Sequence, residues 1–222
     1  MTIKNVKTLF FDYDGTIHNS LEIYKPAFLD VYDWLVNQGY KKPRTWHDYE
    51  IKQFLGQNPK SMWESFGKGL PDEIRKAASR RIGKNMQIYM SENMAVLYER
   101  ALETLAILKD RGYTLIFISN CTNAYMKAHI KAFNLDAYFT MMVNAETYDY
   151  ISKSKILKTI MKDFDKDMAI IGDRYYDMQA GKENGIYTIG CTYGFGSPNE
   201  LVDATMTIDS IETLLTIFKK SL

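Results

Sequence analysis

An apolar stretch that ends in two carboxylates and a glycine constrains this chain more than any other part of its sequence. Residues 8–11 form a short, β-favouring apolar run, and Asp12, Asp14 and Gly15 follow it closely. Such a run is typical of a strand buried on both faces, as in a parallel sheet. Asp12 and Asp14 lie on the same side of an extended chain, where they repel each other unless they share a proton or bind a cation such as Mg²⁺. The other interpretation is a polar strand end that caps the next helix.

The composition is that of an ordinary globular protein and shows no sign of a polyanionic partner. Of the 222 residues, 46% are hydrophobic and 25% are charged, and the formal net charge is +1. A charge so close to zero gives no reason to expect a nucleic acid polymer or an anionic membrane as a partner. The two cysteines, Cys121 and Cys191, are too few for a disulfide framework or a four-thiolate zinc site.

Targeting and membrane-spanning patterns are not found in the sequence. The apolar run near the N-terminus is short and is interrupted by Asp12 and Asp14, which is unlike a signal peptide. No stretch approaches the roughly 20 apolar residues that cross a bilayer. We therefore expect a cytoplasmic protein with no membrane partner. The sequence leaves open whether it is a monomer or homodimer.

Helical periodicity dominates the stretch after the first strand. Apolar residues recur at three- and four-residue spacing and predict helices over 20–38, 46–55, 61–66 and 71–90. Pro26 falls inside the first helix and predicts its first turn or a kink there. We interpret residues 17–93 as an inserted all-helical cap domain, and residues 1–16 together with 94–222 as the catalytic core domain.

From residue 94 onward, strands alternate with helices. The predicted strands are 113–118, 138–143, 168–171, 186–189 and a weak 205–208, with helices over 99–109, 124–133, 152–164, 178–184 and 211–219. This alternation predicts an α/β fold with a doubly wound parallel sheet. Ligands of such sheets sit beyond the carboxyl ends of the strands. Three predicted strands end in polar residues there, namely Asp12 with Asp14, Ser119 with Asn120, and Asp173.

Four motifs, in order along the chain, resemble those of the haloacid dehalogenase superfamily, in its branch with a helical cap after the first strand. Residues 12–16 match the first motif, DxDGT, and Ser119 after an apolar strand matches the second. Lys153 at a helix start matches the third, and residues 172–177 match the fourth, GDxxxD. The tail over 185–196 resembles the phosphoglycolate-phosphatase-like group. The resemblance covers the whole chain.

This resemblance implies a Mg²⁺-dependent phosphatase that hydrolyses a small phosphomonoester through an aspartyl-phosphate. It makes Asp12 the nucleophile that attacks phosphorus. Asp14 would protonate the leaving oxygen and then deprotonate the attacking water, and its backbone carbonyl would bind Mg²⁺. Asp14 also disfavours dehalogenation, because dehalogenases of the superfamily lack this second Asp.

The second and third motifs supply groups for the phosphoryl oxygens. Ser119 would donate its hydroxyl, although a serine at a strand end also commonly caps the next helix. Asn120 would add a backbone N–H. Lys153 would place a positive charge beside the nucleophile and the phosphate. Lys155 is the alternative lysine, because both lie at one lysine-rich helix start.

The fourth motif supplies acidic groups for the metal. Asp173 is the carboxylate we expect to bind Mg²⁺ directly. Asp177 lies four residues further on and would contact the metal through a water molecule or hydrogen-bond to one of its ligands. The other interpretation is an acid in the first turn of a helix, which the helix dipole favours. The expected metal site therefore comprises Asp12, Asp14, Asp173 and Asp177.

Other functions share parts of this pattern. A phosphomutase of the same superfamily has all four motifs. A phospho-receiver module or an inactive binding protein is a further alternative, disfavoured by the helical insertion and by the complete set of motif residues. The sequence leaves phosphoglycolate, a nucleotide and a sugar phosphate open as substrates.

Two parts of the cap concern substrate selection. Lys60 and Trp63, in and after the most loop-like cap segment, are possible substrate contacts, although an ordinary exposed loop is the preferred interpretation. Arg80, Arg81 and Lys84 form a small basic cluster that we interpret as a solvated helix face. The three histidines show no metal-ligand spacing.

Overall fold

A six-stranded parallel sheet forms the centre of the core in this computed structural model, which describes residues 3, 5–164 and 167–219. The order of the strands is β3-β2-β1-β4-β5-β6. The bounds are β1 (Thr8–Phe11), β2 (Thr114–Ser119), β3 (Met141–Asn144), β4 (Met168–Gly172), β5 (Tyr187–Cys191) and β6 (Met206–Ile208). The apolar run identified first in the sequence is thus a central strand, because β1 pairs with β2 on one side and with β4 on the other. The predicted doubly wound α/β fold is confirmed.

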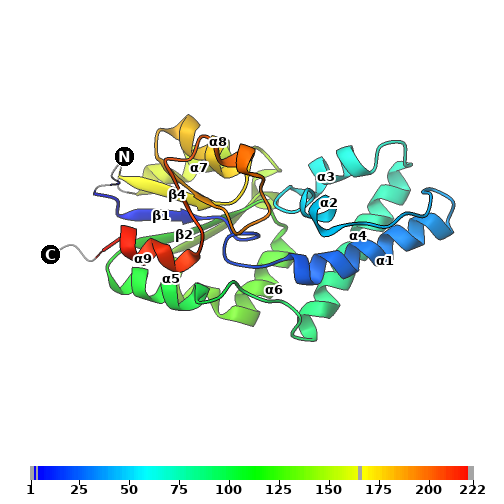
Figure 1. Ribbon diagram of the computed structural model, residues 1–222, viewed down its shortest axis with the longest axis horizontal. Coiled ribbons are helices and arrows are strands. Elements are labelled where there is room, and N and C mark those ends of the chain that lie inside the picture. The colour runs from blue at the N-terminus through cyan, green and yellow to red at the C-terminus, as the bar shows by residue number, and fades with distance from the viewer. Residues whose placement is uncertain (1–2, 4, 165–166, 220–222) are drawn as a thin grey trace.

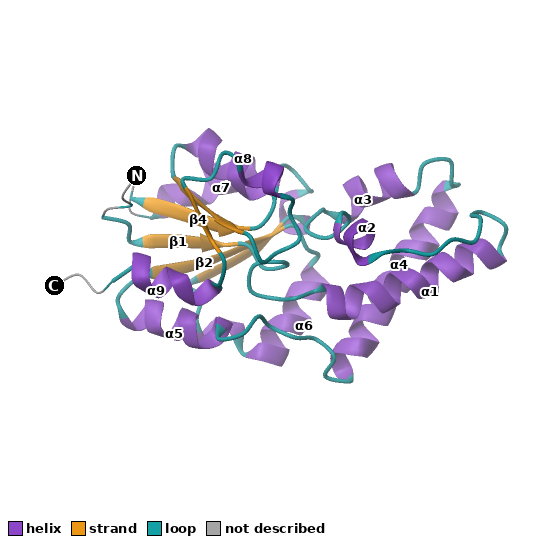
Figure 2. Cartoon of the chain, viewed as in Figure 1, coloured by secondary structure: helices purple, strands orange, loops and turns teal. Residues whose placement is uncertain are grey.

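Helices cover both faces of this sheet (Figure 1). Leu9 and Phe11 of β1 belong to one buried cluster, and Phe10 between them belongs to another, as the two-residue period of a strand requires. The first cluster packs against α5 (Ala101–Asp110), α6 (Asn123–Phe133) and α9 (Leu214–Ile217). The second packs against α7 (Lys153–Ile160) and α8 (Tyr175–Asn184). The carboxyl ends of the strands point toward the remaining helices (Figure 2).

Those remaining helices lie together at one end of the molecule, around a third buried cluster. They are α1 (Leu21–Asn37), α2 (Asp48–Lys52), α3 (Pro59–Phe66) and α4 (Asp72–Ser91). Phe28 of α1 lies at the centre of this cluster, with ring centroids 4.9 Å from Trp46 and 5.2 Å from Phe66. Phe195, from a loop of the other part of the chain, also joins the cluster.

The bounds of several helices differ from the predicted ones. The helix predicted over 46–55 covers only Asp48–Lys52, because Trp46 packs against Phe28 before the helix begins and Glu50 caps the new start by accepting from the His47 N–H. Pro26 lies inside α1, beyond its first turn. The segment predicted as helical over 152–164 ends as a 3₁₀ helix, and the segment predicted over 211–219 begins as one. Short 3₁₀ helices occur at Leu135–Ala137, Glu146–Tyr148, Met161–Asp163, Pro198–Leu201 and Ile211–Thr213.

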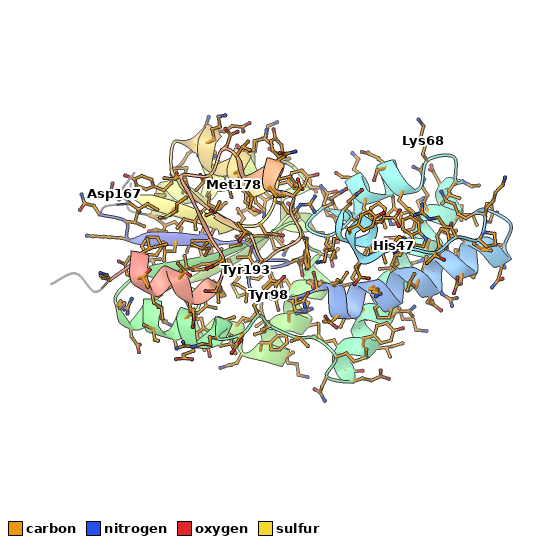
Figure 3. The ribbon with its side chains drawn as sticks, in the orientation of Figure 1. His47, Lys68, Tyr98, Asp167, Met178 and Tyr193 are labelled. Carbon is orange, nitrogen blue, oxygen red and sulfur yellow. The ribbon has the colours of Figure 1, made fainter. Side chains whose placement is uncertain are left out.

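The two segments that link the helical part to the sheet run side by side. The Asn19 N–H donates to the Val96 carbonyl, and the Tyr98 N–H donates to the Ile17 carbonyl, each at 2.9 Å. Tyr193 buttresses them: its hydroxyl donates to the Thr16 carbonyl at 2.9 Å, and its ring lies 4.8 Å from that of Tyr98 (Figure 3). The chain therefore enters and leaves the helical part at one place.

Within the described residues, no helix has both the length and the apolarity needed to cross a membrane. Residues 1–2, 4, 165–166 and 220–222 of the predicted core lie outside the described residues.

Candidate active site

A buried lysine and three carboxylates meet at the carboxyl edge of the sheet. Asp12 follows β1, Asp173 follows β4, and Asp177 lies in the first turn of α8. Lys153 begins α7, and its ammonium donates to Asp12 Oδ1 at 2.8 Å and to Asp177 Oδ1 at 2.6 Å. Their side chains are at most 4% exposed in these two ion pairs. Parallel strands and the βα connections bring these groups together, although they are up to 165 positions apart in the sequence.

The charges of this cluster do not balance. Carboxylate oxygens of Asp12, Asp173 and Asp177 all lie within 4.8 Å of one another, and Lys153 is the cation that contacts the cluster. Burial and repulsion by Asp177 raise the pKa of Asp12 to about 7, against the attraction of Lys153. Burial, with repulsion by Asp12 and Asp177, raises the pKa of Asp173 well above its usual value. The geometry holds more negative charge than one lysine neutralises.

One oxygen of this cluster has no partner. Asp173 Oδ2 accepts from the Phe195 N–H at 2.6 Å, whereas Oδ1 is buried without a hydrogen bond in the described structure. A buried carboxylate oxygen that lacks a donor is costly, and a hard cation is the ligand that suits it. The residues at this site therefore fit a divalent metal ion.

Two glycines make room for Asp173. A Cβ atom on Gly15 would lie 2.2 Å from Asp173 Oδ2, and one on Gly194 would lie 2.3 Å from Asp173 Cβ. Gly15 also has a φ of +85°, which side chains rarely adopt. Gly15 of the first motif and Gly194 of the glycine-rich tail thus pack against the same aspartate. A larger side chain at either position would clash with Asp173.

Lys153 and Lys155 occupy different environments. Lys153 is buried, and although burial alone would lower its pKa, Asp12 and Asp177 outweigh it and raise the pKa. Lys155 is exposed. Asp177 makes two contacts: Oδ1 accepts from Lys153, and Oδ2 accepts from the Arg174 N–H as an N-terminal capping group. This cap also explains why α8 begins at Tyr175, three residues before the predicted start.

Ser119 and Asn120 lie at the end of β2 and line the same cavity as Asp12. Ser119 does not cap α6, because Thr122 accepts from the Tyr125 N–H in that role. The Ser119 hydroxyl accepts weakly from the Cys121 N–H at 3.3 Å. It therefore keeps its hydrogen for another acceptor. The Asn120 side chain is engaged, since its amide donates to the Gly56 carbonyl at 2.9 Å.

Asp14 is held by two side chains that the sequence analysis did not connect with it. The Tyr125 hydroxyl donates to Asp14 Oδ1 at 2.6 Å, and His18 Nδ1 lies 3.1 Å from the same oxygen. Burial alone would raise the pKa of Asp14, but these hydrogen bonds outweigh it and lower the pKa. His18 and His129, far apart in the sequence, have ring centroids 4.6 Å apart here. A tyrosine and a histidine give no local pattern that would have predicted these contacts.

A cavity of about 510 Å³ lies above the carboxylates. Its core side includes Asp12, Asp14, Ser119 and Tyr125, and its other side is built from α1, α3, α4 and the loop between α2 and α3. Trp63 lines this cavity, as the sequence suggested, whereas the exposed Lys60 does not belong to the lining.

The basic cluster on α4 is exposed, and part of it borders the cavity. Arg81 pairs with Asp30, with nitrogen to oxygen distances of 2.6 and 2.9 Å. Arg80 and Lys84 are exposed, as a solvated helix face requires, and they also line the cavity. The sequence did not indicate this second property. Which side of α4 faces the sheet depends on how the helices dock, and the charge pattern does not encode it.

The loop between α2 and α3 is tied to the core at two points. Asn120 donates to the Gly56 carbonyl, and the Arg174 guanidinium donates to the Leu55 carbonyl. Arg174 Nε also donates to Glu200 Oε2 at 2.8 Å, which fixes the side chain in place. Arg174 belongs to the fourth motif, yet its role here is to hold the cavity wall.

Comparison with known proteins agrees with this geometry. The sequence model of the haloacid dehalogenase-like hydrolases matches residues 9–191, which span the strand ends from β1 to β5. The chain belongs to the haloacid dehalogenase-like hydrolase family. It is therefore a hydrolase by family.

Relatives in this family include named phosphatases. A phosphoglycolate phosphatase of Pasteurella multocida is 28% identical, covering 96% of this chain and 98% of the relative. The pyrophosphatase PpaX of Bacillus pumilus is 23% identical, covering 87% of this chain and 86% of the relative. A solved structure described as a predicted phosphatase from Clostridium acetobutylicum superposes with a TM-score of 0.78 at 22% identity, covering 95% of this chain and 97% of that one. This last likeness supports the fold.

Proposed function

We propose that this haloacid dehalogenase-like hydrolase is a Mg²⁺-dependent phosphatase that hydrolyses a small phosphomonoester through an aspartyl-phosphate. The observation that carries the proposal is the buried cluster of Asp12, Asp173 and Asp177 around Lys153, of which Asp12 lines a cavity at the strand ends. Such a cluster provides a nucleophilic carboxylate and positive charge for an anionic reaction centre. The phosphatase names of the relatives point the same way.

In the first step, Asp12 attacks phosphorus and the bond from phosphorus to the ester oxygen breaks. Asp14 supplies the proton that this leaving oxygen takes up. Lys153 stabilises charge on Asp12 and on the phosphoryl oxygens, and Ser119 donates its hydroxyl to one of them, together with the Asn120 backbone N–H. The product alcohol leaves, and the phosphoryl group remains on Asp12.

In the second step, Asp14 takes a proton from water as the water attacks phosphorus and the Asp12–phosphorus bond breaks. Inorganic phosphate leaves, and Asp14 is again protonated for the next cycle. The Tyr125 and His18 contacts favour the ionised form of Asp14, which suits this base role. The first step needs protonated Asp14. Its Oδ2 atom can carry that proton to the leaving oxygen, because Tyr125 and His18 contact Oδ1.

Asp12, Asp173 and the backbone carbonyl of Asp14 would hold Mg²⁺. Asp177 would contact the ion through a water molecule or orient one of these ligands. When bound, the ion would neutralise charge on the carboxylates and on the phosphoryl group. We further propose that residues 17–93 act as a cap domain on the core formed by 1–16 and 94–222. The cap would exclude water and select the leaving group.

The first test is phosphate release from p-nitrophenyl phosphate with Mg²⁺, with and without EDTA. We expect metal-dependent release that Asp12→Asn abolishes, because an amide is not a competent nucleophile. Asp173→Asn should raise the Mg²⁺ concentration needed for half-maximal rate, and Asp14→Asn should leave phosphate on acid-quenched protein. Release that is insensitive to EDTA and to Asp12→Asn would contradict the proposal. Isomerisation of a sugar phosphate without release of phosphate would identify a mutase instead.

A further inference from the structure

The cap side of the cavity carries a largely apolar wall. Phe54, Met62, Trp63 and Met86 line it, together with the ring of Tyr24. Trp63 and Met62 are mostly buried in the third cluster and show only an edge to the cavity. A leaving group bound to phosphorus above Asp12 faces this wall. The wall gains nothing from a small, fully charged leaving group, because apolar surface is stabilised by contact with other apolar surface.

The loop between α2 and α3, which lines the cavity, is tied to the core. Asn120 and Arg174 hold the Gly56 and Leu55 carbonyls against the core, so the wall is docked rather than swung away. The volume of about 510 Å³ therefore belongs to a docked cap. A two-carbon acid or a second phosphate would leave most of that volume to water.

Two cations on α4 complete the cap side. Arg80 and Lys84 lie one helical turn apart and both line the cavity. In the part of the chain that the structure describes, neither forms an ion pair, whereas the neighbouring Arg81 pairs with Asp30. The acidic residues of the cavity, Asp12, Asp14 and Glu146, all come from the core. The cap therefore presents unpaired positive charge next to its apolar wall.

We propose that the substrate is a phosphomonoester of an alcohol with an apolar, ring-sized body and a second anionic group, the body lying on the wall around Trp63 and the anion binding Arg80 and Lys84. This inference rests on the proposed phosphatase function and names the class of its leaving group. This substrate class differs from phosphoglycolate, whose leaving group has the anion but no apolar ring. It also differs from pyrophosphate, which is charged throughout.

Four esters of similar leaving-group acidity test the two features separately: ethyl phosphate, phosphoglycolate, benzyl phosphate and 4-carboxybenzyl phosphate. We expect the ring to raise kcat/KM at least tenfold over ethyl phosphate. We expect the ring carboxylate to raise it about tenfold again. Phosphoglycolate as the best of the four, or no gain from the ring, would overturn the inference while leaving the phosphatase function intact.

Charge-removing variants assign the anion site. Arg80→Met and Lys84→Met should each lower kcat/KM for 4-carboxybenzyl phosphate about tenfold and leave benzyl phosphate within twofold. Lys76→Met is the matched control, because it removes the same charge from α4 at an exposed residue that pairs with Glu73 outside the cavity. Equal losses for both esters, or an equal effect of Lys76→Met, would overturn the assignment to Arg80 and Lys84.

Removal of wall side chains tests the body site. Met86→Ala is the first choice, because Met86 is only half-buried and the fold should tolerate its loss. It should lower kcat/KM for both benzyl esters and spare ethyl phosphate. Trp63→Leu should do so more strongly, with a thermal unfolding curve to show that the protein is folded. Protein that hydrolyses neither these esters nor p-nitrophenyl phosphate would overturn the phosphatase function, and this inference with it.

Discussion

At the scale of single residues, the site depends on side chains that contact the four motifs from outside them. Asp14 is the clearest case, because Tyr125 and His18 both hold its Oδ1 atom. In the proposed mechanism Asp14 donates and then accepts a proton, which needs a fixed orientation toward the leaving oxygen and the water. Tyr125 lies on α6 and also lines the cavity, so the group that holds Asp14 is itself part of the cavity wall.

Tyr125→Phe should weaken proton transfer by Asp14. We expect kcat/KM to fall roughly 10- to 100-fold for alkyl phosphates, as a hydrogen bond to a charged group is worth about 1.5–3 kcal/mol. For p-nitrophenyl phosphate the loss should be much smaller, because its leaving group needs little protonation. Tyr49→Phe, at an exposed tyrosine, is the control. A loss of equal size for both esters would show that Tyr125 has a general structural role instead.

The two candidate lysines can be separated in the same way. Lys153→Met should lower kcat at least 100-fold, because three buried carboxylates then lose the ammonium that contacts two of them. Lys155→Met removes an equal charge from an exposed position of the same helix and should stay within twofold. Steady-state kinetics on circular-dichroism-matched samples measure both. Activity retained by Lys153→Met would remove Lys153 from the mechanism.

At the scale of elements, the loop between α2 and α3 is the contact through which the cap reaches the site. Arg174 follows Asp173 in the fourth motif, and its guanidinium donates to the Leu55 carbonyl. Its Nε atom donates to Glu200. Gly56 lies against Arg174, since a Cβ atom there would be 2.8 Å from Arg174 Cγ. One side chain thus links the residue next to Asp173 in the core to the wall of the cavity.

Arg174→Lys should loosen this loop without removing the charge. A lysine has one short-range point of contact and cannot serve Leu55 and Glu200 in the same fork-like way. We expect faster hydrogen exchange at residues 53–58 and a raised KM with a smaller change in kcat. Unchanged exchange in this segment would show that Asn120 alone secures the loop. Lys182→Arg, an exposed pair with Asp203, is a suitable control.

At the scale of the whole molecule, the two parts differ in how far the sequence predicts them. Alternating strands and helices predict the sheet, and because parallel strands share one carboxyl edge, they also predict that Asp12, Ser119 and Asp173 converge. The positions of Tyr125, Arg80 and Lys84 around the cavity were not predictable. They depend on how α4 and α6 dock onto neighbouring elements, and the periodicity of a helix gives its buried face but not its partner.

A buried histidine should make the stability of the whole protein depend on pH. Burial, together with His18, lowers the pKa of His129 to about 3, against an unfolded value of about 6.5. Nearby Asp14 opposes this shift. Below pH 6.5 the unfolded chain takes up a proton at His129 that the folded protein does not, so stability is lost as the pH falls toward 3.

Urea unfolding at pH 7.5 and pH 5.0 measures this effect. His129→Phe should remove about 2 kcal/mol of the stability difference between these pH values, since the unfolded His129 titrates over the roughly 1.5 pH units between 6.5 and 5.0 while the folded one stays neutral. The variant also leaves the Tyr13 hydroxyl without its 2.7 Å partner, which lowers stability at both pH values equally. His47→Phe, at an exposed residue, is the control. An identical pH difference in His129→Phe and the unaltered protein would contradict the assignment.

The paired linkers near Tyr193 have a consequence for how such proteins diversify. Because the chain leaves the sheet after Thr16 and returns beside the same point at Tyr98, everything between these residues is a single excursion from an otherwise continuous core. An insertion of different length and composition could replace it between these two linkers without moving a strand end. Under the proposed function, substrate range could therefore change in the helical part while Asp12 and Asp173 stay in place in the core.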